Sequence, residues 1–393
     1  MRKVYFDHNA TTPVHPEVRR AVAPYLEELF GNPSSIHWSG REVRKGIEDA
    51  RGAVAAFFGC QPLEVVFTGS GTESDNLAIK GIAMRRGNGG KHIVTSRVEH
   101  PAVLNSCRFL EKQGYRVTYA PVNRQGVVEP DAVRSAITPD TILVSIMYAN
   151  NETGAIMPIR EIGGIAREAG VLMHTDAVQA AGKIPIDWAA LPVDLLTFSA
   201  HKVNALKGAG GLIVRKGIEI EANVHGGHQE RGRRGGTENV VGIVGMGKAF
   251  ELLRDHMAEE VEETRRLRDR FEERLFRRIP ELVRNGPLDG RLPNTVNISF
   301  RYVEGEAMLL NLDMVGIACS SGSACTSGSL EPSPVLMAMG ADPIDAQGAL
   351  RFSLGQENSE ADVDYAVDAI EVVVNKLRAL SPIYPGAREA KAR

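Results

Sequence analysis

Short, unbroken runs of apolar residues alternate along the first part of the chain with longer stretches in which apolar residues recur every three or four positions. Seven such runs are predicted to be buried strands, at residues 64–68, 93–95, 116–119, 142–146, 171–175, 195–198 and 211–214. Helical periodicity separates several of them, for example at residues 102–113 and 159–168. This alternation predicts an α/β domain with a mostly parallel, seven-stranded sheet.

The second part of the chain has a different pattern. Residues 240–279 are predicted to form one long helix, of the kind that carries a chain from one domain to the next. A strand at 295–300 and a closing helix at 361–380 then indicate a smaller α+β domain. We expect a large domain at residues 13–255, and a small domain made of residues 1–12 with 256–393. The opening segment would be an arm that docks elsewhere.

Composition excludes several classes of protein. The 393 residues are 24% charged with a formal net charge of -3, so no general basic field favours nucleic acid or an anionic membrane. No apolar run approaches the roughly 18 residues that suggest a membrane span. Four cysteines are too few for a disulfide scaffold in a chain of this size. We therefore expect a cytoplasmic protein with free thiols.

Two of the apolar runs end in residues that carry chemistry. The run at 171–175 ends in Asp176, and the run at 195–198 leads into Ser199, His201 and Lys202. In parallel sheets, ligands bind at the carboxyl ends of the strands. A lysine that forms a Schiff base and an acid that holds a pyridinium nitrogen are the two protein groups that pyridoxal phosphate needs. Taken alone, however, a lysine in a loop is more often simply solvated.

Other strand ends offer further candidates, each with a plainer alternative. Gly71 and Thr72 stand where a strand turns into a helix, so they could bind a phosphate through backbone N–H groups, or form an ordinary capped turn. His100 could stack on a flat cofactor or carry a proton, or could simply lie where a helix starts. Asn151 could donate to a phenolic oxygen or stabilise a turn.

Three features lie outside this sheet. The serine- and glycine-rich stretch 320–329 predicts an exposed, reactive Cys325, whereas Cys319 suits a buried, inert thiol. Arg351 could hold a carboxylate with two hydrogen bonds or form a surface ion pair. The basic stretch 229–237 could be a solvated loop or an anion-binding arm. We expect no metal site, since the histidine and cysteine spacings do not suit one.

Considered together, these residues fall into ordered motifs. They are DHNATT at 7–12, GTESDN at 71–76, EHPAV at 99–103, NNETG at 150–154, DAVQ at 176–179, SAHK at 199–202 and SGSACT at 321–326. The set resembles the cysteine desulfurases of the NifS/IscS type, which are class V aminotransferase-like enzymes. The resemblance implies a pyridoxal-phosphate homodimer of fold type I. It would convert L-cysteine to L-alanine and hold the sulfur as a persulfide on Cys325, for iron–sulfur cluster assembly with a scaffold protein as acceptor.

The resemblance also implies a role for each residue. Lys202 would carry the cofactor and move the Cα proton, Asp176 would pair with the pyridine nitrogen, and His100 would stack on the ring. The phosphate would be held by Gly71, Thr72, Ser199 and His201, with Thr237 reaching in from the partner subunit. Gln179 and Asn151 would lie near the phenolic oxygen of the cofactor. Arg351 and Asn151 would bind the substrate. Cys325 would attack the substrate sulfur as a thiolate, and could also ligate a cluster transiently.

Alternatives and departures accompany this interpretation. A selenocysteine lyase, an aminotransferase or another class V enzyme would share most of these motifs, and a sulfur carrier with a vestigial cofactor site would need no catalysis. The stretch 203–208 lacks the proline usual in the family, which leaves the shape of that loop open. The stretch 229–234 is more similar to the NifS branch than to the IscS branch.

Overall fold

A seven-stranded sheet forms the centre of the computed structural model, which describes residues 2–87, 89–321, 332–382 and 384–385. The strands, in spatial order, are β2 (Val65–Thr68), β8 (Gly210–Val214), β7 (Leu195–Ser199), β6 (Leu172–Asp176), β5 (Thr141–Ser145), β3 (His92–Ser96) and β4 (Arg116–Ala120). All neighbours from β7 to β4 are parallel, whereas β8 runs antiparallel to both β2 and β7. The predicted mostly parallel, seven-stranded sheet is therefore confirmed.

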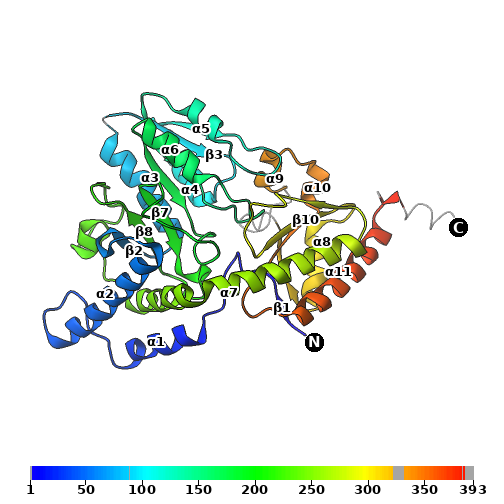
Figure 1. Ribbon diagram of the computed structural model, residues 1–393, viewed down its shortest axis with the longest axis horizontal. Helices are drawn as coiled ribbons and strands as arrows, with labels where there is room; N and C mark the ends of the chain where they lie inside the picture. The colour runs from blue at the N-terminus through cyan, green and yellow to red at the C-terminus, as the bar shows by residue number, and fades with distance from the viewer. Residues whose placement is uncertain (1, 88, 322–331, 383, 386–393) are drawn as a thin grey trace.

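Helices cover both faces of this sheet (Figure 1). One face packs against α3 (Gly71–Arg86) and α4 (Pro101–Glu111), and the other against α2 (Trp38–Phe58), α5 (Pro130–Ala136), α6 (Ile159–Glu168) and the first part of α7 (Val240–Arg278). Successive residues of a strand point to opposite faces of the sheet and pack in different hydrophobic cores. Leu195 packs in the core on the α3 side, and Leu196 packs in the core on the opposite side. Because every residue of the central strands is buried, these strands appear in the sequence as unbroken apolar runs.

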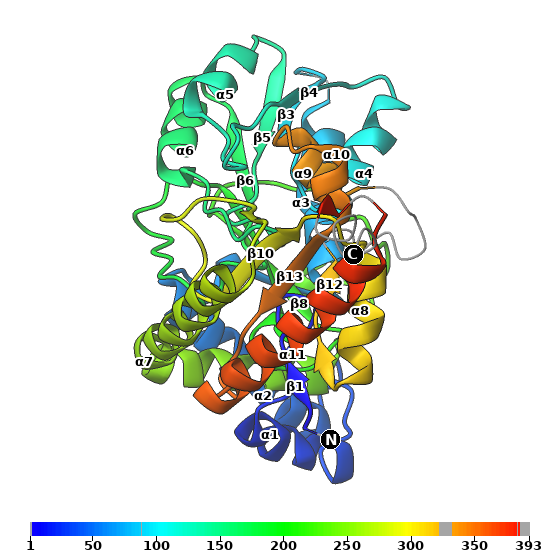
Figure 2. The ribbon, with the colours of Figure 1, turned by 90° about the vertical axis from the view of Figure 1, so that its right-hand side faces the viewer.

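The small domain is built on a four-stranded antiparallel sheet in the order β12 (Ser320–Ser321), β13 (Ala349–Ser353), β10 (Thr295–Phe300) and β9 (Leu282–Arg284). Figure 2 shows α8 (Gly305–Met314) and α11 (Glu360–Leu380) lying side by side on this domain. The remaining helices are α1 (Pro16–Glu27), α9 (Pro334–Ala338) and α10 (Pro343–Gln347). Strand β1 (Val4–Tyr5) pairs with β11 (Ile317–Ala318).

Helix α7 connects the two domains, as the long periodic stretch predicts (Figure 1). Its first half packs in the core of the large sheet, and its second half, from Leu267 to Leu275, packs in a separate core with Phe6 and Phe352. The second core thus combines the N-terminal segment, the end of α7 and the C-terminal part of the chain. The exact limits, 13–255 and 1–12 with 256–393, stay a prediction.

Asn9 fastens the N-terminal segment between the two domains. Its side-chain amide donates to Thr295 Oγ1 at 2.9 Å and to the Asn151 carbonyl at 3.3 Å, and its Oδ1 accepts from Asn294 Nδ2 at 3.0 Å. Its backbone N–H donates to Ser353 Oγ at 2.9 Å. Since Asn9 is only 1% exposed, none of these groups has water as an alternative partner.

Replacing this side chain tests its importance. We expect Asn9→Ala to lower the free energy of unfolding by about 3 kcal/mol, because buried partners in both domains lose a hydrogen bond without gaining water. Urea unfolding of the cofactor-free protein measures the change. The control is Asn105→Ala, whose side chain bonds only Arg108 on an exposed face and which should cost at most about 0.5 kcal/mol. Equal effects of the two substitutions would contradict the fastening role.

Candidate active site

The sheet brings Asp176 and Lys202 to the same edge. Asp176 is the last residue of β6, and the neighbouring parallel strand β7 ends at Ser199, directly before the 3₁₀ turn Ala200–Lys202. Asp176 lies opposite Thr197 in the register of the two strands. The Lys202 amine donates to the carbonyls of Asn9 and Ala10, the latter at 2.7 Å. The prediction that neighbouring strands deliver the acid and the amine to one edge is confirmed.

The environment of Asp176 suits a cationic ring nitrogen. Burial raises the pKa of its carboxyl, while the nearby His100 and Lys202 and the Val178 N–H act in the opposite direction. That N–H donates to Asp176 Oδ1 at 2.9 Å. A buried carboxylate is stable in its ionised form only beside positive charge or several donors. A protonated pyridine nitrogen would supply such a charge.

His100 is held in a fixed orientation next to this acid. Its Nδ1 accepts the Ala102 N–H at 3.1 Å and so caps the start of α4. Burial, in the first place, and the charge of Lys202 lower the pKa of His100, although Asp176 works against them. The structure thus shows His100 at a helix start and beside Asp176, whereas its stacking on a flat cofactor or its transfer of a proton stays a prediction.

The start of α3 provides a cradle for an anion. The helix begins at Gly71, and a Cβ atom there would lie 2.8 Å from Val178 Cγ2 and 3.4 Å from Ser199 Cβ, so only glycine fits without a shift. The Ser199 hydroxyl is buried and has no hydrogen-bond partner among the described residues. An unsatisfied hydroxyl beside the N-terminus of a helix is suited to a phosphate. The residues present thus fit the phosphate of the expected cofactor.

His201 lies in the 3₁₀ turn that follows β7, two residues after Ser199. Its Nδ1 lies 3.2 Å from Thr11 Oγ1. Burial, followed by the charges of Lys202 and Lys207, lowers the pKa of His201 to about 4. These neighbours favour the neutral ring, which has one N–H that can donate a hydrogen bond to a phosphate.

Arg351 lies on β13 at the opposite side of the site. Its guanidinium donates to Asp7 Oδ1 at 2.8 Å and to the Asn151 carbonyl at 3.0 Å, and its Nε is buried without a partner among the described residues. Arg351 does form an ion pair, with Asp7, but its side chain is only 4% exposed, so the pair is buried and not on the surface as one alternative expected. Asn151 takes part through its carbonyl and not, in this structure, through a side-chain hydrogen bond within the described chain.

The remaining candidates differ in how far the structure places them. Gln179 lies within the site, where its amide donates to the Asn9 carbonyl at 3.0 Å. Thr72 stands in the first turn of α3, next to Gly71. Thr237 is exposed and makes no side-chain hydrogen bond within the described part of its own chain. Cys325 lies outside the described residues, so its predicted position is not tested here.

The loop after Lys202 takes its shape from the N-terminal segment, not from the missing proline. Asn204 has a left-handed backbone with φ of 58°, which asparagine tolerates better than most residues. Its N–H donates to Thr12 Oγ1 at 2.8 Å, and its side-chain amide donates to the Pro13 carbonyl at 3.0 Å. The departure from the family pattern therefore leaves the loop firmly docked.

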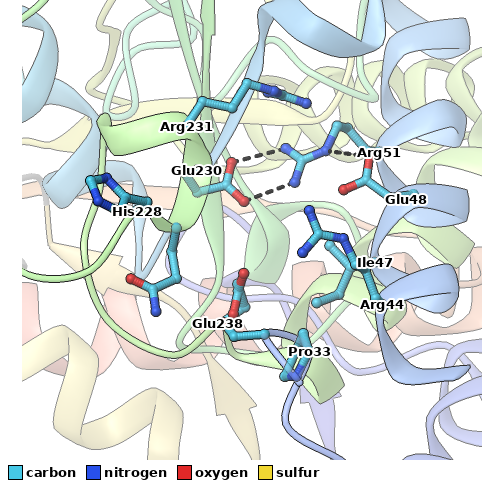
Figure 3. A pocket seen from close by; sticks show the side chains of 11 residues that line it. Pro33, Arg44, Ile47, Glu48, Arg51, His228, Glu230, Arg231 and Glu238 are labelled. Atoms are coloured by element: carbon cyan, nitrogen blue, oxygen red, sulfur yellow. Dashed lines mark hydrogen bonds and ion pairs between the residues drawn. The ribbon is translucent and has the colours of Figure 1, made fainter. Parts of the chain in front are cut away.

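The basic stretch is also more tightly held than either sequence interpretation implies. Glu230 is buried and forms two hydrogen bonds with Arg51, at 2.8 and 2.9 Å (Figure 3). Arg234 pairs with Glu73 at 2.9 Å. A cavity of about 410 Å³ lies between this stretch and residues 33–51, with Glu238 on its wall. Protein carboxylates thus supply counter-charges, and a freely solvated loop is the wrong description.

Sequence reasoning missed several polar residues that complete the site. Asp7 and Asn9 belong to the DHNATT motif, yet nothing in the pattern of apolar residues shows that Asp7 would hold Arg351. Glu99 accepts from Ser96 Oγ at 2.6 Å and from the Met147 N–H, and burial raises its pKa to about 8. Lys183 is buried nearby. Buried ionisable residues are uncommon, so only the three-dimensional structure identifies them.

Comparisons with known proteins agree with this geometry. Residues 4–366 match the Aminotransferase class-V family. The cysteine desulfurase IscS of Dictyoglomus turgidum is 52% identical over 382 residues, which cover 97% of each chain. The solved structure of a NifS-like protein superposes with a TM-score of 0.91 at 39% identity, covering 96% of this chain and 100% of that one. The chain therefore belongs to the class-V aminotransferases.

Within that class, the similar proteins share one kind of name. Another solved structure, SspA in complex with cysteine, has a TM-score of 0.80 at 36% identity and covers 91% of this chain and 100% of its own. The curated relatives near 50% identity are named cysteine desulfurases. The expected resemblance to the NifS/IscS type is confirmed, and so is the fold class.

In the part of the chain that the structure describes, no group of three or more His, Cys, Asp or Glu side chains could hold a metal ion. No described helix is both long enough and apolar enough to cross a membrane.

The buried Glu99 generates a prediction about pH. Its pKa of about 8 in the folded protein lies above the ordinary value of 4.5, so the unfolded chain loses this proton first as the pH rises. Stability should therefore fall between about pH 4.5 and 8. We expect Glu99→Gln to weaken that decline, since the amide carries no charge. The unfolding temperature, recorded from pH 5 to 8, measures the decline. The control is Glu129→Gln at an exposed position. A decline of the same size in all three proteins would show that Glu99 is not its source.

Proposed function

We propose that this cysteine desulfurase binds pyridoxal phosphate between Asp176 and Lys202, converts L-cysteine to L-alanine, and transfers the sulfur to Cys325 as a persulfide. The observation that carries the proposal is the meeting of a buried acid and a lysine amine at the ends of neighbouring parallel strands. Beside them lie the unsatisfied Ser199 hydroxyl and the N-terminus of α3. Acid, amine and anion cradle are what this cofactor requires.

Each end of the cofactor would have its own residues. Asp176 would hold the ring nitrogen, His100 would stack on the ring, and Gln179 and Asn151 would face its phenolic oxygen. The phosphate would be held by Gly71, Thr72, Ser199 and His201, and by Thr237 of the partner subunit. The cofactor, when bound, supplies a sink for the electron pair that develops at the substrate Cα.

The chain's own side chains then orient and act on the substrate. Arg351, with Asn151, would hold the substrate carboxylate, and Lys202 would take and return the proton at Cα. The thiolate of Cys325 would attack the substrate sulfur, so that an S–S bond forms and the C–S bond breaks. The electron pair of the C–S bond would stay with the three-carbon fragment, which would take up a proton at Cβ and leave as alanine. The relatives' names and the cysteine found in the SspA structure support cysteine as the substrate. The thiol of Cys319 suits the reaction poorly, because burial and Asp7 raise its pKa.

Two alternatives have less support. The names of the relatives favour a cysteine desulfurase over a selenocysteine lyase or another class V enzyme. A sulfur carrier with a vestigial site would have no reason to keep Asp176 and Lys202 in position. The IscS names of several relatives support a role in iron–sulfur cluster assembly. A scaffold protein in the cytoplasm is the sulfur acceptor in this proposal, and Cys325 would be the residue to ligate a cluster transiently.

The enzyme is proposed to be a homodimer, and the connection between α1 and α2 supports this (Figure 1). Large apolar side chains in this connection and at the adjoining ends of the two helices face solvent in the single chain: Leu26 is 70% exposed, Phe30 83%, Ile36 90% and Trp38 65%. Such a patch indicates a protein interface. Pro33, in the same connection, lines the cavity that also borders Glu238, next to Thr237 (Figure 3). A second copy on this face would be well placed to receive Thr237.

Two substitutions separate the proposed roles of the amine and the thiol. Lys202→Ala should abolish the visible band near roughly 400 nm and lower alanine release by about 10²-fold or more, because both cofactor attachment and proton transfer are lost. Cys325→Ala should keep the band but form no persulfide, measured by mass spectrometry of the tryptic peptide. The control Cys60→Ala should keep both the visible band and the formation of the persulfide. A Cys325→Ala protein that releases alanine at the parental rate would remove Cys325 from the mechanism.

The interface has its own test. We expect Ile36→Glu to yield monomers in size-exclusion chromatography with light scattering, because a carboxylate in the centre of an apolar contact is desolvated without a partner. Leu310→Glu, on α8, is the matched control: Leu310 is also exposed, at 62%, but lies away from this face, so the dimer should persist. A dimeric Ile36→Glu protein would place the interface elsewhere.

A further inference from the structure

Lys183 is a buried cation that the reaction described above leaves without a role. It is 9% exposed and follows Gly182, whose φ of 75° and tight packing against Leu253 fix the turn after β6. Its amine donates to the Gln179 carbonyl at 3.2 Å and to Gln179 Oε1 at 3.4 Å. Within the described chain, no carboxylate lies within salt-bridge distance of that nitrogen.

The contact with Gln179 has a direct consequence for the site. Because Lys183 takes the amide oxygen, the amide nitrogen of Gln179 is turned the other way, toward the Asn9 carbonyl at 3.0 Å. The same carbonyl accepts the Lys202 amine. Lys183 thereby determines which end of the Gln179 amide faces the residue that would carry the cofactor, since an amide bonded at both ends has one orientation.

Positive charge also gathers around Lys183. Burial first, then the charges of Lys202 and Arg351, lower the pKa of Lys183 to about 7. A small cavity of about 60 Å³ is lined by Lys183, Lys202 and His8, whose Nε2 is buried without a partner in the described chain. Glu260 also lines it, but bonds to Gln356.

A role in stability alone would not explain this arrangement. A buried ammonium near other cations costs free energy, and a neutral side chain of similar length would fill the same space at a lower cost. The substrate carboxylate and the cofactor's phosphate and phenolic oxygen are all anionic. A positive potential at this end of the site favours each of them.

We propose that Lys183 is a positioning residue for the cofactor: it orients the Gln179 amide toward the phenolic oxygen, and its ammonium adds positive potential behind Lys202. The inference rests on the proposed function. Both effects disfavour a proton on the Lys202 nitrogen that carries the cofactor. The Gln179 amide, as a donor, stabilises the phenolic oxygen in its anionic form, and the Lys183 ammonium repels a second positive charge on Lys202.

The test is a pH titration of the visible band of the bound cofactor, in the parent and in three variants. We expect Lys183→Met to raise the pH of the band transition by about one unit, the size of shift that a single nearby charge produces. Lys183→Gln, which keeps a donor for Gln179 but no charge, should give a smaller rise. Lys248→Met removes an equivalent charge from an exposed pair with Glu251, and should match the parent.

The possible outcomes are distinguishable. If the parent shows a visible band and neither Lys183 variant shifts its transition, this proposal is overturned while the proposed function stands. If the parent binds no cofactor, both fail. Thermal unfolding of the cofactor-free proteins shows whether each variant folds; should Lys183→Met fail to fold, Lys183→Gln decides. If a Lys183 variant unfolds at a lower temperature but the pH transition of its visible band does not move, Lys183 contributes to stability only.

Discussion

The structure depends on one buried point of contact, the peptide of Asn9. Its carbonyl accepts hydrogen bonds from Gln179 and Lys202 of the large domain, while its side chain bonds Thr295 and Asn294 of the small domain. Because these groups are shielded from water, each contact defines the position of its partner. The N-terminal segment is therefore a structural part of the active site, not a peripheral extension of the fold.

The interior around Asn9 contains ionisable groups of both signs. On one side, burial raises the pKa of Asp75, of Glu99 and of Asp176. On the other side, burial lowers the pKa of Lys183 and His201. The carbonyl groups of Asn9 and Ala10 accept hydrogen bonds from the Lys202 amine and are neutral acceptors in this charged interior. A lysine amine reacts with an aldehyde in its neutral form, and neutral acceptors of this kind bind that form as well as the ammonium.

Much of the fold could be predicted from the sequence because buried parallel strands leave a clear mark. The runs at 142–146 and 195–198 lie almost where β5 and β7 lie, since strands covered on both faces must be apolar throughout. The strand ends then led to Asp176 and Lys202 by a general rule of α/β sheets. What the sequence could not reveal were contacts between distant segments.

The pairing of Asp7 with Arg351 is one such contact, because it joins residues 344 positions apart. Periodicity describes how a residue relates to its own element, and it contains no information about which loop will cover that element. The same limit applies to Lys183, which looks like any solvated lysine until the turn at Gly182 directs it inward. The same is true of Glu230. It stands among arginines in the sequence, and nothing in that neighbourhood predicts that it is buried against the distant Arg51.

The described chain also shows how the site is connected to the segment that contains Cys325, the proposed sulfur acceptor. Ser320 pairs with Arg351 across β12 and β13, and its hydroxyl donates to Asp7 Oδ1 at 2.8 Å. Asp7 in turn holds the Arg351 guanidinium. The residues that lead toward Cys325 are thus attached to the same acid that orients the proposed substrate-binding arginine. A change at Asp7 would disturb substrate binding and the approach to Cys325 together, because one carboxylate supports both.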